Sequence, residues 1–185
     1  YLTLASNQND PVAQNNLGNI YLEGEYIKRN INKAIHYYSL ASYQNYPAAQ
    51  TNLGFIYLEG KYIERDINKA IYYLTLASNQ NEPSAQIILG NIYYEGKYIK
   101  RDINKAIHYL TLSANQNEPI AQAKLGFIYS EGEYIERDIN KAIYYYSLAS
   151  NQNEPSAQNN LGFIYYEGKY IERDINKSIY YFTLS

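Results

Sequence analysis

The stretch that decides the fold runs from Pro83 to Glu118 and reads PSAQIILGNIYYEGKYIKRDINKAIHYLTLSANQNE. Near-copies of this stretch precede and follow it, and consecutive prolines lie 36 positions apart along the 185 residues. All prolines share one phase of the repeat and all glycines share two: Pro11, Pro47, Pro83, Pro119 and Pro155; Gly18, Gly54, Gly90, Gly126 and Gly162; Gly24, Gly60, Gly96, Gly132 and Gly168. A fixed period of this length indicates a repeat architecture instead of one globular core.

Each repeat predicts two helices. The first begins at the proline, which is favoured at the first helical position, and spans Pro83 to Glu95 in the third repeat. Gly96 ends it as a left-handed cap. The second helix follows an N-cap residue and runs to about Ser78 in the second repeat. The N-cap residues are Asn30, Asp66, Asp102, Asp138 and Asp174, and the chain turns back at Asn81, Asn117 and Asn153.

The glycine in the middle of each first helix needs a steric explanation. Glycine costs about 1 kcal/mol relative to alanine at such a position, yet Gly90 has a counterpart in all the repeats. We therefore expect the second helix to approach the first closely at Gly90. Apolar residues recur at helical intervals on both helices, and one pair cannot bury its apolar faces alone, so neighbouring repeats must stack.

The predicted organisation is a single all-α array over residues 1–185. It consists of a partial helix at residues 1–8 and repeats at 11–46, 47–82, 83–118, 119–154 and 155–185. The chain begins at residues equivalent to Tyr37 to Ala41, half-way along a helix, and Ser185 ends it within that same stretch of the repeat. We therefore expect the chain to be a fragment of a longer protein.

The composition narrows the class of function. The net charge is -2 and both signs are scattered through every repeat, so we expect no nucleic-acid partner. No apolar run approaches the roughly 18 residues that span a bilayer, so we expect no membrane insertion. The lack of cysteine excludes disulfides and thiolate metal sites without fixing the compartment. We expect a cytoplasmic protein.

The repeated residues resemble those of the Sel-one-like repeat family, a relative of the tetratricopeptide repeats. The resemblance covers the whole chain and rests, in one repeat, on Ala85, Leu89, Gly90, Tyr93, Gly96, Ile99, Asp102, Lys105, Ala106, Tyr109 and the pair Ser113-Ala114. Two family positions differ. A tyrosine replaces the usual second loop glycine at Tyr26, Tyr62, Tyr98, Tyr134 and Tyr170, and the common tryptophan is replaced by His36, Tyr72, His108, Tyr144 and Tyr180.

The resemblance implies a solenoid in which antiparallel helix pairs form a right-handed superhelix with the first helices on the concave side. It also implies a non-enzymatic adaptor or scaffold for protein complexes. Members of the family serve in signalling, protein quality control and host–microbe contact, and some carry a kinase or another catalytic domain in the same polypeptide.

No group of residues suggests catalysis, because nearly every polar side chain recurs in all the repeats. The two histidines, His36 and His108, lie two repeats apart. At roughly 10 Å per helix layer they could not share a metal ion, and we interpret them as half-buried packing residues. We expect no enzymatic activity, no cofactor and no metal site.

Two other recurring residue types have structural interpretations. The arginines before the N-cap could bind acidic groups of a partner, but we expect them to anchor the loop or form an ion pair: Arg29, Arg65, Arg101, Arg137 and Arg173. Tyrosines at two fixed phases are expected in the core: Tyr21, Tyr57, Tyr93, Tyr129 and Tyr165; Tyr37, Tyr73, Tyr109, Tyr145 and Tyr181.

The positions that differ between repeats on the first helix fall on one helical face. In tetratricopeptide-like arrays this face lines the groove, and its mixture of asparagines and apolar rings suits a bound peptide or helix. Neutral drift on a solvated face would give the same variation. The candidate stripe consists of Asn15, Asn16, Asn19 and Leu22; Thr51, Asn52, Phe55 and Leu58; Ile87, Ile88, Asn91 and Tyr94; Lys124, Phe127 and Ser130; Asn159, Asn160, Phe163 and Tyr166.

Three functions are compatible with this pattern. The first is a protein-binding scaffold that holds a peptide or helix on the stripe. The second is a structural filament, because repeats that begin and end at the same phase can continue head to tail. The third is a regulatory region of an enzyme encoded elsewhere in the same polypeptide.

Overall fold

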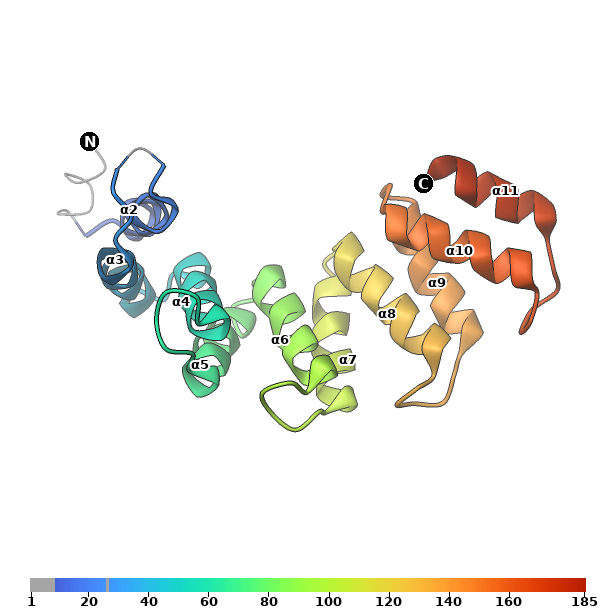
Figure 1. Cartoon of the computed structure of the whole chain (residues 1–185), viewed down its shortest axis with the longest axis horizontal. Helices are drawn as coiled ribbons and strands as arrows, with labels where there is room; N and C mark the ends of the chain where they lie inside the picture. Colours follow the sequence, from blue (N-terminus) through green and yellow to red (C-terminus); the bar gives the residue numbers. More distant parts are fainter. Residues whose placement is uncertain (1–8, 26) are drawn as a thin grey trace. The chain divides into compact units, whose positions relative to one another are not determined.

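A computed structural model describes residues 9–25 and 27–185 (Figure 1). These residues form helices and loops, with no strand among them, and the predicted all-α repeat class is confirmed. The expected partial helix at residues 1–8 lies outside the described part. The helices are α2 (Pro11–Glu23), α3 (Ile31–Tyr43), α4 (Pro47–Glu59), α5 (Ile67–Ser78), α6 (Pro83–Glu95), α7 (Ile103–Ala114), α8 (Pro119–Glu131), α9 (Ile139–Ser150), α10 (Pro155–Glu167) and α11 (Ile175–Leu184).

The first helices, α2, α4, α6, α8 and α10, begin at a proline and end before a glycine, as predicted. Gly132 follows α8 with a φ of 63°, in the left-handed region that costs glycine no Cβ clash. The carboxylate of Asp10 accepts a hydrogen bond of 2.9 Å from the backbone N–H of Val12. Glu118 makes no such side-chain bond, so its side chain stabilises the start of α8 only through its negative charge.

The second helices, α3, α5, α7, α9 and α11, each begin after a side-chain cap. Asp138 Oδ1 accepts a hydrogen bond of 3.0 Å from the backbone N–H of Lys141, and Asn30 does the same for Lys33. The asparagines predicted at the turns, Asn81, Asn117 and Asn153, have positive φ, and so do Asn9 and Asn45 at the same phase of the repeat. The sequence therefore locates helix ends well, because specific residue types determine them.

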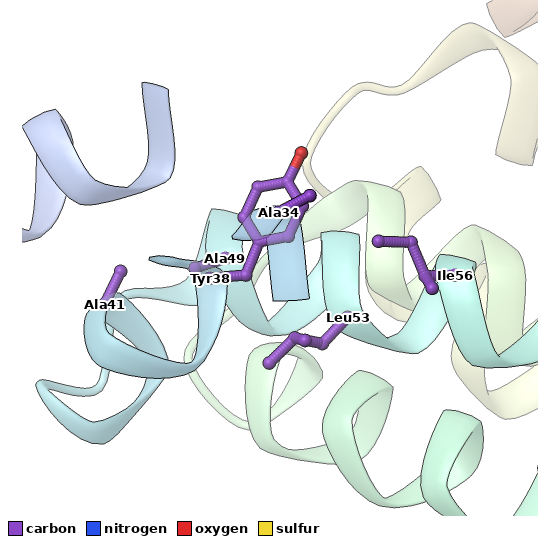
Figure 2. Close-up of a cluster of buried hydrophobic side chains, with 6 residues drawn as sticks. All are labelled: Ala34, Tyr38, Ala41, Ala49, Leu53 and Ile56. Carbon is purple, nitrogen blue, oxygen red and sulfur yellow. The ribbon is translucent and has the colours of Figure 1, made fainter. Parts of the chain in front are cut away.

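The chain divides into two compact units, one ending at Leu89 and the other starting at Gly90, within α6. In the first unit α3 packs against both α2 and α4, and α4 against α5; in the second, the same order runs from α7 to α11. Figure 2 shows the core of the first unit, in which side chains of α3 meet those of α4: Ala34, Tyr38, Ala41, Ala49, Leu53 and Ile56. The core of the second unit uses the equivalent Ala142, Tyr146, Ala149, Ala157 and Leu161, with Ala123.

The glycines within the first helices lie against the second helix of the same repeat. A Cβ atom built on Gly54 would lie 2.5 Å from Leu74 Cγ, and one on Gly90 would lie 2.7 Å from Leu110 Cγ. Real Cβ atoms do not approach other carbons so closely, because they would overlap within van der Waals radii. The predicted close approach of the two helices is confirmed.

The tyrosines expected in the core are only half-buried. They form stacked pairs at the edge of each helix pair, with ring centroids 5.7 Å apart for Tyr21 and Tyr37 and 5.9 Å apart for Tyr129 and Tyr145. A lysine ammonium lies over one ring of each pair, as Lys141 does over Tyr129 at 5.0 Å. Among the tyrosines that the structure describes, Tyr38 and Tyr146 are fully buried, and burial raises the pKa of Tyr146 to about 12.

Candidate functional site

The residues of the candidate stripe lie on the first helices with unequal exposure. Asn15 is buried, with 6% of its surface exposed. Five residues are exposed: Phe55, Phe127, Asn159, Phe163 and Tyr166. The others are half-buried: Asn16, Asn19, Leu22, Thr51, Asn52, Leu58, Ile87, Ile88, Asn91, Tyr94, Lys124, Ser130 and Asn160.

In the first unit, asparagines of the stripe bond to one another. The Asn52 amide on α4 donates to the side-chain oxygens of Asn15 and Asn19 on α2, at 3.1 and 3.3 Å. The Tyr38 hydroxyl also donates to Asn19 Oδ1, at 2.7 Å. These groups link neighbouring repeats, so fewer of the asparagine donors and acceptors face a partner than the sequence suggested.

In the second unit, aromatic rings of the stripe pack against one another and against a loop tyrosine. The Tyr94 ring on α6 meets the Phe127 ring on α8 edge to face, with centroids 6.3 Å apart, and meets Tyr134 in the same manner at 6.2 Å. The guanidinium of Arg101 lies over the Tyr134 ring, 3.9 Å from its centroid. This cluster presents apolar ring surface together with a fixed positive charge.

Recesses open beside two of the exposed phenylalanines. One, of about 270 Å³, lies between α2 and α4 and is lined by Leu22, Phe55, Ile56, Glu59, Lys61 and Tyr62. The other, of about 280 Å³, lies between α8 and α10 and is lined by Ser130, Glu131, Arg137, Ile139, Asn160, Phe163, Ile164, Glu167, Lys169 and Tyr170. The residues that line the first recess are equivalent, by position in the repeat, to residues that line the second. The two recesses therefore arise from the same part of the repeat.

The arginines Arg29, Arg65, Arg101 and Arg137 anchor the loop that follows the first helix of their repeat, as the sequence suggested. Arg137 Nε donates to the carbonyl oxygen of Ser130 at 2.7 Å, and Nη2 donates to that of Glu131 at 2.7 Å. Its Nη1 donates to the Tyr170 hydroxyl. The arginine thus satisfies carbonyls at the end of α8 and holds a ring of the recess in the next repeat.

The charge at the start of each loop differs between repeats and acts on the adjacent tyrosine. Lys61 lowers the pKa of Tyr62 through a side-chain hydrogen bond, whereas Glu133 raises the pKa of Tyr134 in the same way. The two rings stand at the same phase. The loop residue therefore shifts the pKa values of Tyr62 and Tyr134 in opposite directions.

The histidines are not half-buried, contrary to our expectation. His36 and His108 are exposed, and each ring meets the following tyrosine, Tyr37 or Tyr109, edge to face at 5.4 and 5.2 Å. Both stand at the same phase of the repeat, on α3 and α7. Among residues 9–25 and 27–185, no three His, Cys, Asp or Glu side chains gather as metal ligands would. None of the described helices is long and apolar enough to cross a membrane.

The model of the Sel1 repeat matches the chain at residues 11–46, 47–82, 83–118, 119–154 and 155–185. The chain belongs to the Sel1 repeat family. Sel1 repeat proteins are generally scaffolds for protein interactions and typically are not enzymes. A search of curated proteins found no match.

Solved structures of Sel1 repeat proteins are similar to this chain. A protective antigen of uropathogenic Escherichia coli strains, which displays an SLR fold, is 29% identical with a TM-score of 0.93; the match covers 100% of this chain and 39% of the antigen. A Sel1 repeat protein from Oxalobacter formigenes is 32% identical with a TM-score of 0.85, over 95% of this chain and 72% of that protein. The immunity protein Pa5087 of Pseudomonas aeruginosa, 22% identical over 99% of this chain and 70% of its own, shares the fold at a TM-score of 0.62.

Sequence reasoning missed two sets of residues in this Sel1 repeat array. The loop tyrosines Tyr62 and Tyr170 line the recesses, and the signal was present, since a tyrosine replaces the family's second loop glycine in every repeat. The second set is a glutamine on each first helix that is buried despite its polarity: Gln14, Gln50, Gln86, Gln122 and Gln158. The signal that could have identified these glutamines is that each follows a core alanine at the same phase of the repeat.

Proposed function

We propose that this chain is a non-enzymatic scaffold that binds a peptide or a helix of another protein along the stripe of its first helices. The observation that carries the proposal is the exposure of three phenylalanines at one phase of the repeat. Phe55, Phe127 and Phe163 are 47%, 41% and 50% exposed.

The repeat does not require these rings for packing, because Asn19 and Asn91 stand at the same phase in the other repeats. Large exposed apolar side chains are costly to leave in water and are common at the centres of protein interfaces. Each of Phe55 and Phe163 also borders a recess that would desolvate an inserted side chain. Aromatic anchors beside shallow recesses are the features by which a groove holds an extended segment or one face of a helix.

The test is the selection of ligands from a random peptide library, followed by measurement of Kd by fluorescence anisotropy. Replacing Phe55, Phe127 and Phe163 by Ala should weaken binding of selected peptides at least tenfold, roughly 1.4 kcal/mol or more. The helical circular dichroism should stay unchanged, since these rings are exposed.

A matched control replaces three exposed tyrosines of the second helices by Ala. Tyr72, Tyr144 and Tyr180 are 59%, 58% and 58% exposed and lie on α5, α9 and α11, outside the stripe of first helices. These changes remove as many rings and should leave the Kd unchanged. Failure to select any peptide, or equal binding to the phenylalanine and tyrosine variants, would show that the stripe is not the binding surface.

A further inference from the structure

The recess between α8 and α10 has the size of one large side chain. Its volume of about 280 Å³ lies just below the range of roughly 300–1,000 Å³ that is usual for small-molecule pockets. Phe163 and Ile164 supply apolar walls, and Tyr170 forms one side. The guanidinium carbon of Arg137 and the ammonium of Lys169 lie 4.4 and 5.1 Å from the centroid of the Tyr170 ring and hold that ring in place.

One repeat earlier, a side chain of the protein itself fills the equivalent place. Tyr94 and Ser130 share one phase, the last turn of the first helix, and Phe127 and Tyr134 are the counterparts of Phe163 and Tyr170. The Tyr94 ring packs edge to face on both counterparts, at interplanar angles of 76° and 78°. Burial raises the pKa of Tyr94, which reflects its partial removal from water.

Serine leaves this place open in the next repeat. The Ser130 hydroxyl donates to the carbonyl oxygen of Phe127 at 2.9 Å, within its own helix, and brings no ring toward Phe163 or Tyr170. The walls formed by Phe127 and Tyr134 are therefore like those formed by Phe163 and Tyr170. Only the first pair is covered by a ring of the protein itself, that of Tyr94. Tyr94 shows which kind of side chain these walls accept.

Charge complementarity points to an uncharged side chain. Two cations, Arg137 and Lys169, and two carboxylates, Glu131 and Glu167, line the recess, so their formal charges cancel. The guanidinium of Arg137 is already bonded to two carbonyls and to the Tyr170 hydroxyl. A phosphate or an ammonium group would gain no net attraction here, whereas an aromatic ring would meet two ring edges or faces.

We propose that the recess formed by Ser130, Phe163 and Tyr170 binds one aromatic side chain, Tyr or Phe, from an extended segment of a partner protein. The bound ring takes the place that Tyr94 occupies against Phe127 and Tyr134. This assignment rests on the proposed scaffold function and names the side chain that the stripe recognises. Ser130 then leaves the recess at Phe163 in the fifth repeat open to a ligand, whereas Tyr94 occupies the equivalent recess at Phe127 in the fourth.

The test uses the full chain and acetylated, amidated pentapeptides with a central Tyr, Phe, Leu or Ala between glycines. The chain has four phenylalanines, so their ring resonances can be assigned one by one after 13C labelling. The Tyr and Phe peptides should cause saturable shifts of the Phe163 ring, the Leu peptide should bind at least fivefold more weakly, and the Ala peptide should cause none.

Two substitutions exchange the features of the two repeats. Ser130→Tyr should abolish the Phe163 shifts by filling the recess, and Tyr94→Ser should create saturable shifts at Phe127, where wild type shows none. The hydroxyl oxygens of Tyr146 and Ser130 lie 3.4 Å apart, whereas the repeat that contains Tyr94 has Leu110 at the position equivalent to Tyr146. The pair Ser130→Tyr with Tyr146→Leu therefore reproduces the Tyr94 arrangement if Ser130→Tyr alone disturbs folding.

The outcomes separate this inference from the proposed function. Unchanged Phe163 shifts in the folded Ser130→Tyr variants, or equal binding of the Tyr and Ala peptides, would overturn the inference. If library-selected peptides still depend on Phe55, Phe127 and Phe163 in that case, the scaffold function stands without this recess. If selected peptides ignore the phenylalanines, the scaffold proposal itself is wrong.

Discussion

Ser113 is a polar residue in an apolar environment. Its side chain is fully buried, and none of the described residues lies within hydrogen-bonding reach of its Oγ atom. The equivalent residues Ala41, Ala77 and Ala149 are alanines, also with 0% exposure. The third repeat has the order Ser113-Ala114 where its neighbours have Ala before Ser. A buried hydroxyl without a partner lowers stability, because it loses its bonds to water.

Ser113→Ala should therefore stabilise the protein by about 1 kcal/mol, the lower end of the cost of an unpaired buried hydroxyl. Urea denaturation followed by circular dichroism measures the change. Ala77→Ser is the matched reverse exchange at the same phase and should destabilise the protein by a similar amount. A loss of stability in Ser113→Ala would indicate that the hydroxyl has a partner in solution.

The N-cap aspartates make stability depend on pH. The pKa values of Asp66 and Asp138 are held below the ordinary value, first because each carboxylate accepts a backbone N–H, from Lys69 and Lys141, and also through the lysine ammonium. A group with a lowered pKa in the folded state stabilises it at pH values above the unfolded-state pKa, about 3.9. This stabilisation is lost as the pH falls through the folded-state pKa.

Replacing Asp66 and Asp138 by Asn should reduce the fall of the melting temperature between about pH 5 and pH 2, since asparagine caps a helix without titrating. Asn30 already does so in the first repeat. The comparison is a set of thermal melts of wild type and the double variant across this range. Parallel curves would mean that other carboxylates account for the whole acid transition.

Residue roles were predictable where one residue type satisfies a backbone requirement, as Gly90 and Asp138 do. They were not predictable where the role depends on a distance between helices. Asn15 and Asn52 vary between repeats and were therefore assigned to a binding surface, yet they bond to each other at 3.1 Å. That contact depends on how far α2 lies from α4, which the periodicity does not contain.

At the scale of the helix, the buried glutamines join consecutive elements. Gln122 on α8 accepts a hydrogen bond of 2.9 Å from Gln152, which follows α9, and donates to the carbonyl oxygen of Ala114 at the end of α7, at 3.3 Å. One side chain thus ties a first helix to the second helices on both sides. We did not predict this burial, although the glutamine recurs in every repeat, because a glutamine within a helix is usually at the surface.

A double-mutant cycle on Gln122 and Gln152 measures this link. Gln122→Ala should cost about 1–3 kcal/mol, because it leaves donors and acceptors unpaired in the core. Gln152→Ala should cost less, and the double variant should be more stable than the sum of the single effects predicts. An additive cycle would mean that the hydrogen bond contributes nothing beyond the packing of the two side chains.

At the scale of the whole molecule, repeats of equal length can be removed in register. The stability of such arrays is approximately a sum of repeat and neighbour terms, so the loss of one repeat should shorten the protein without unfolding it. Deleting residues 119–154 joins Glu118 to Pro155, and deleting residues 47–82 joins Tyr46 to Pro83. Each junction reproduces a turn that already exists, and each deletion should lower the denaturant m-value by about one fifth.

The two deletions should differ in ligand binding although they are equal in length. Removing residues 119–154 takes away Ser130 and brings Tyr94 to the place beside Phe163 and Tyr170, so it should abolish the Phe163 shifts caused by the tyrosine pentapeptide. Removing residues 47–82 leaves Ser130 beside Phe163 and should preserve those shifts. Equal binding by the two shortened proteins would show that the residue contributed by the preceding repeat does not control access to the recess, and that the repeats bind independently of their order.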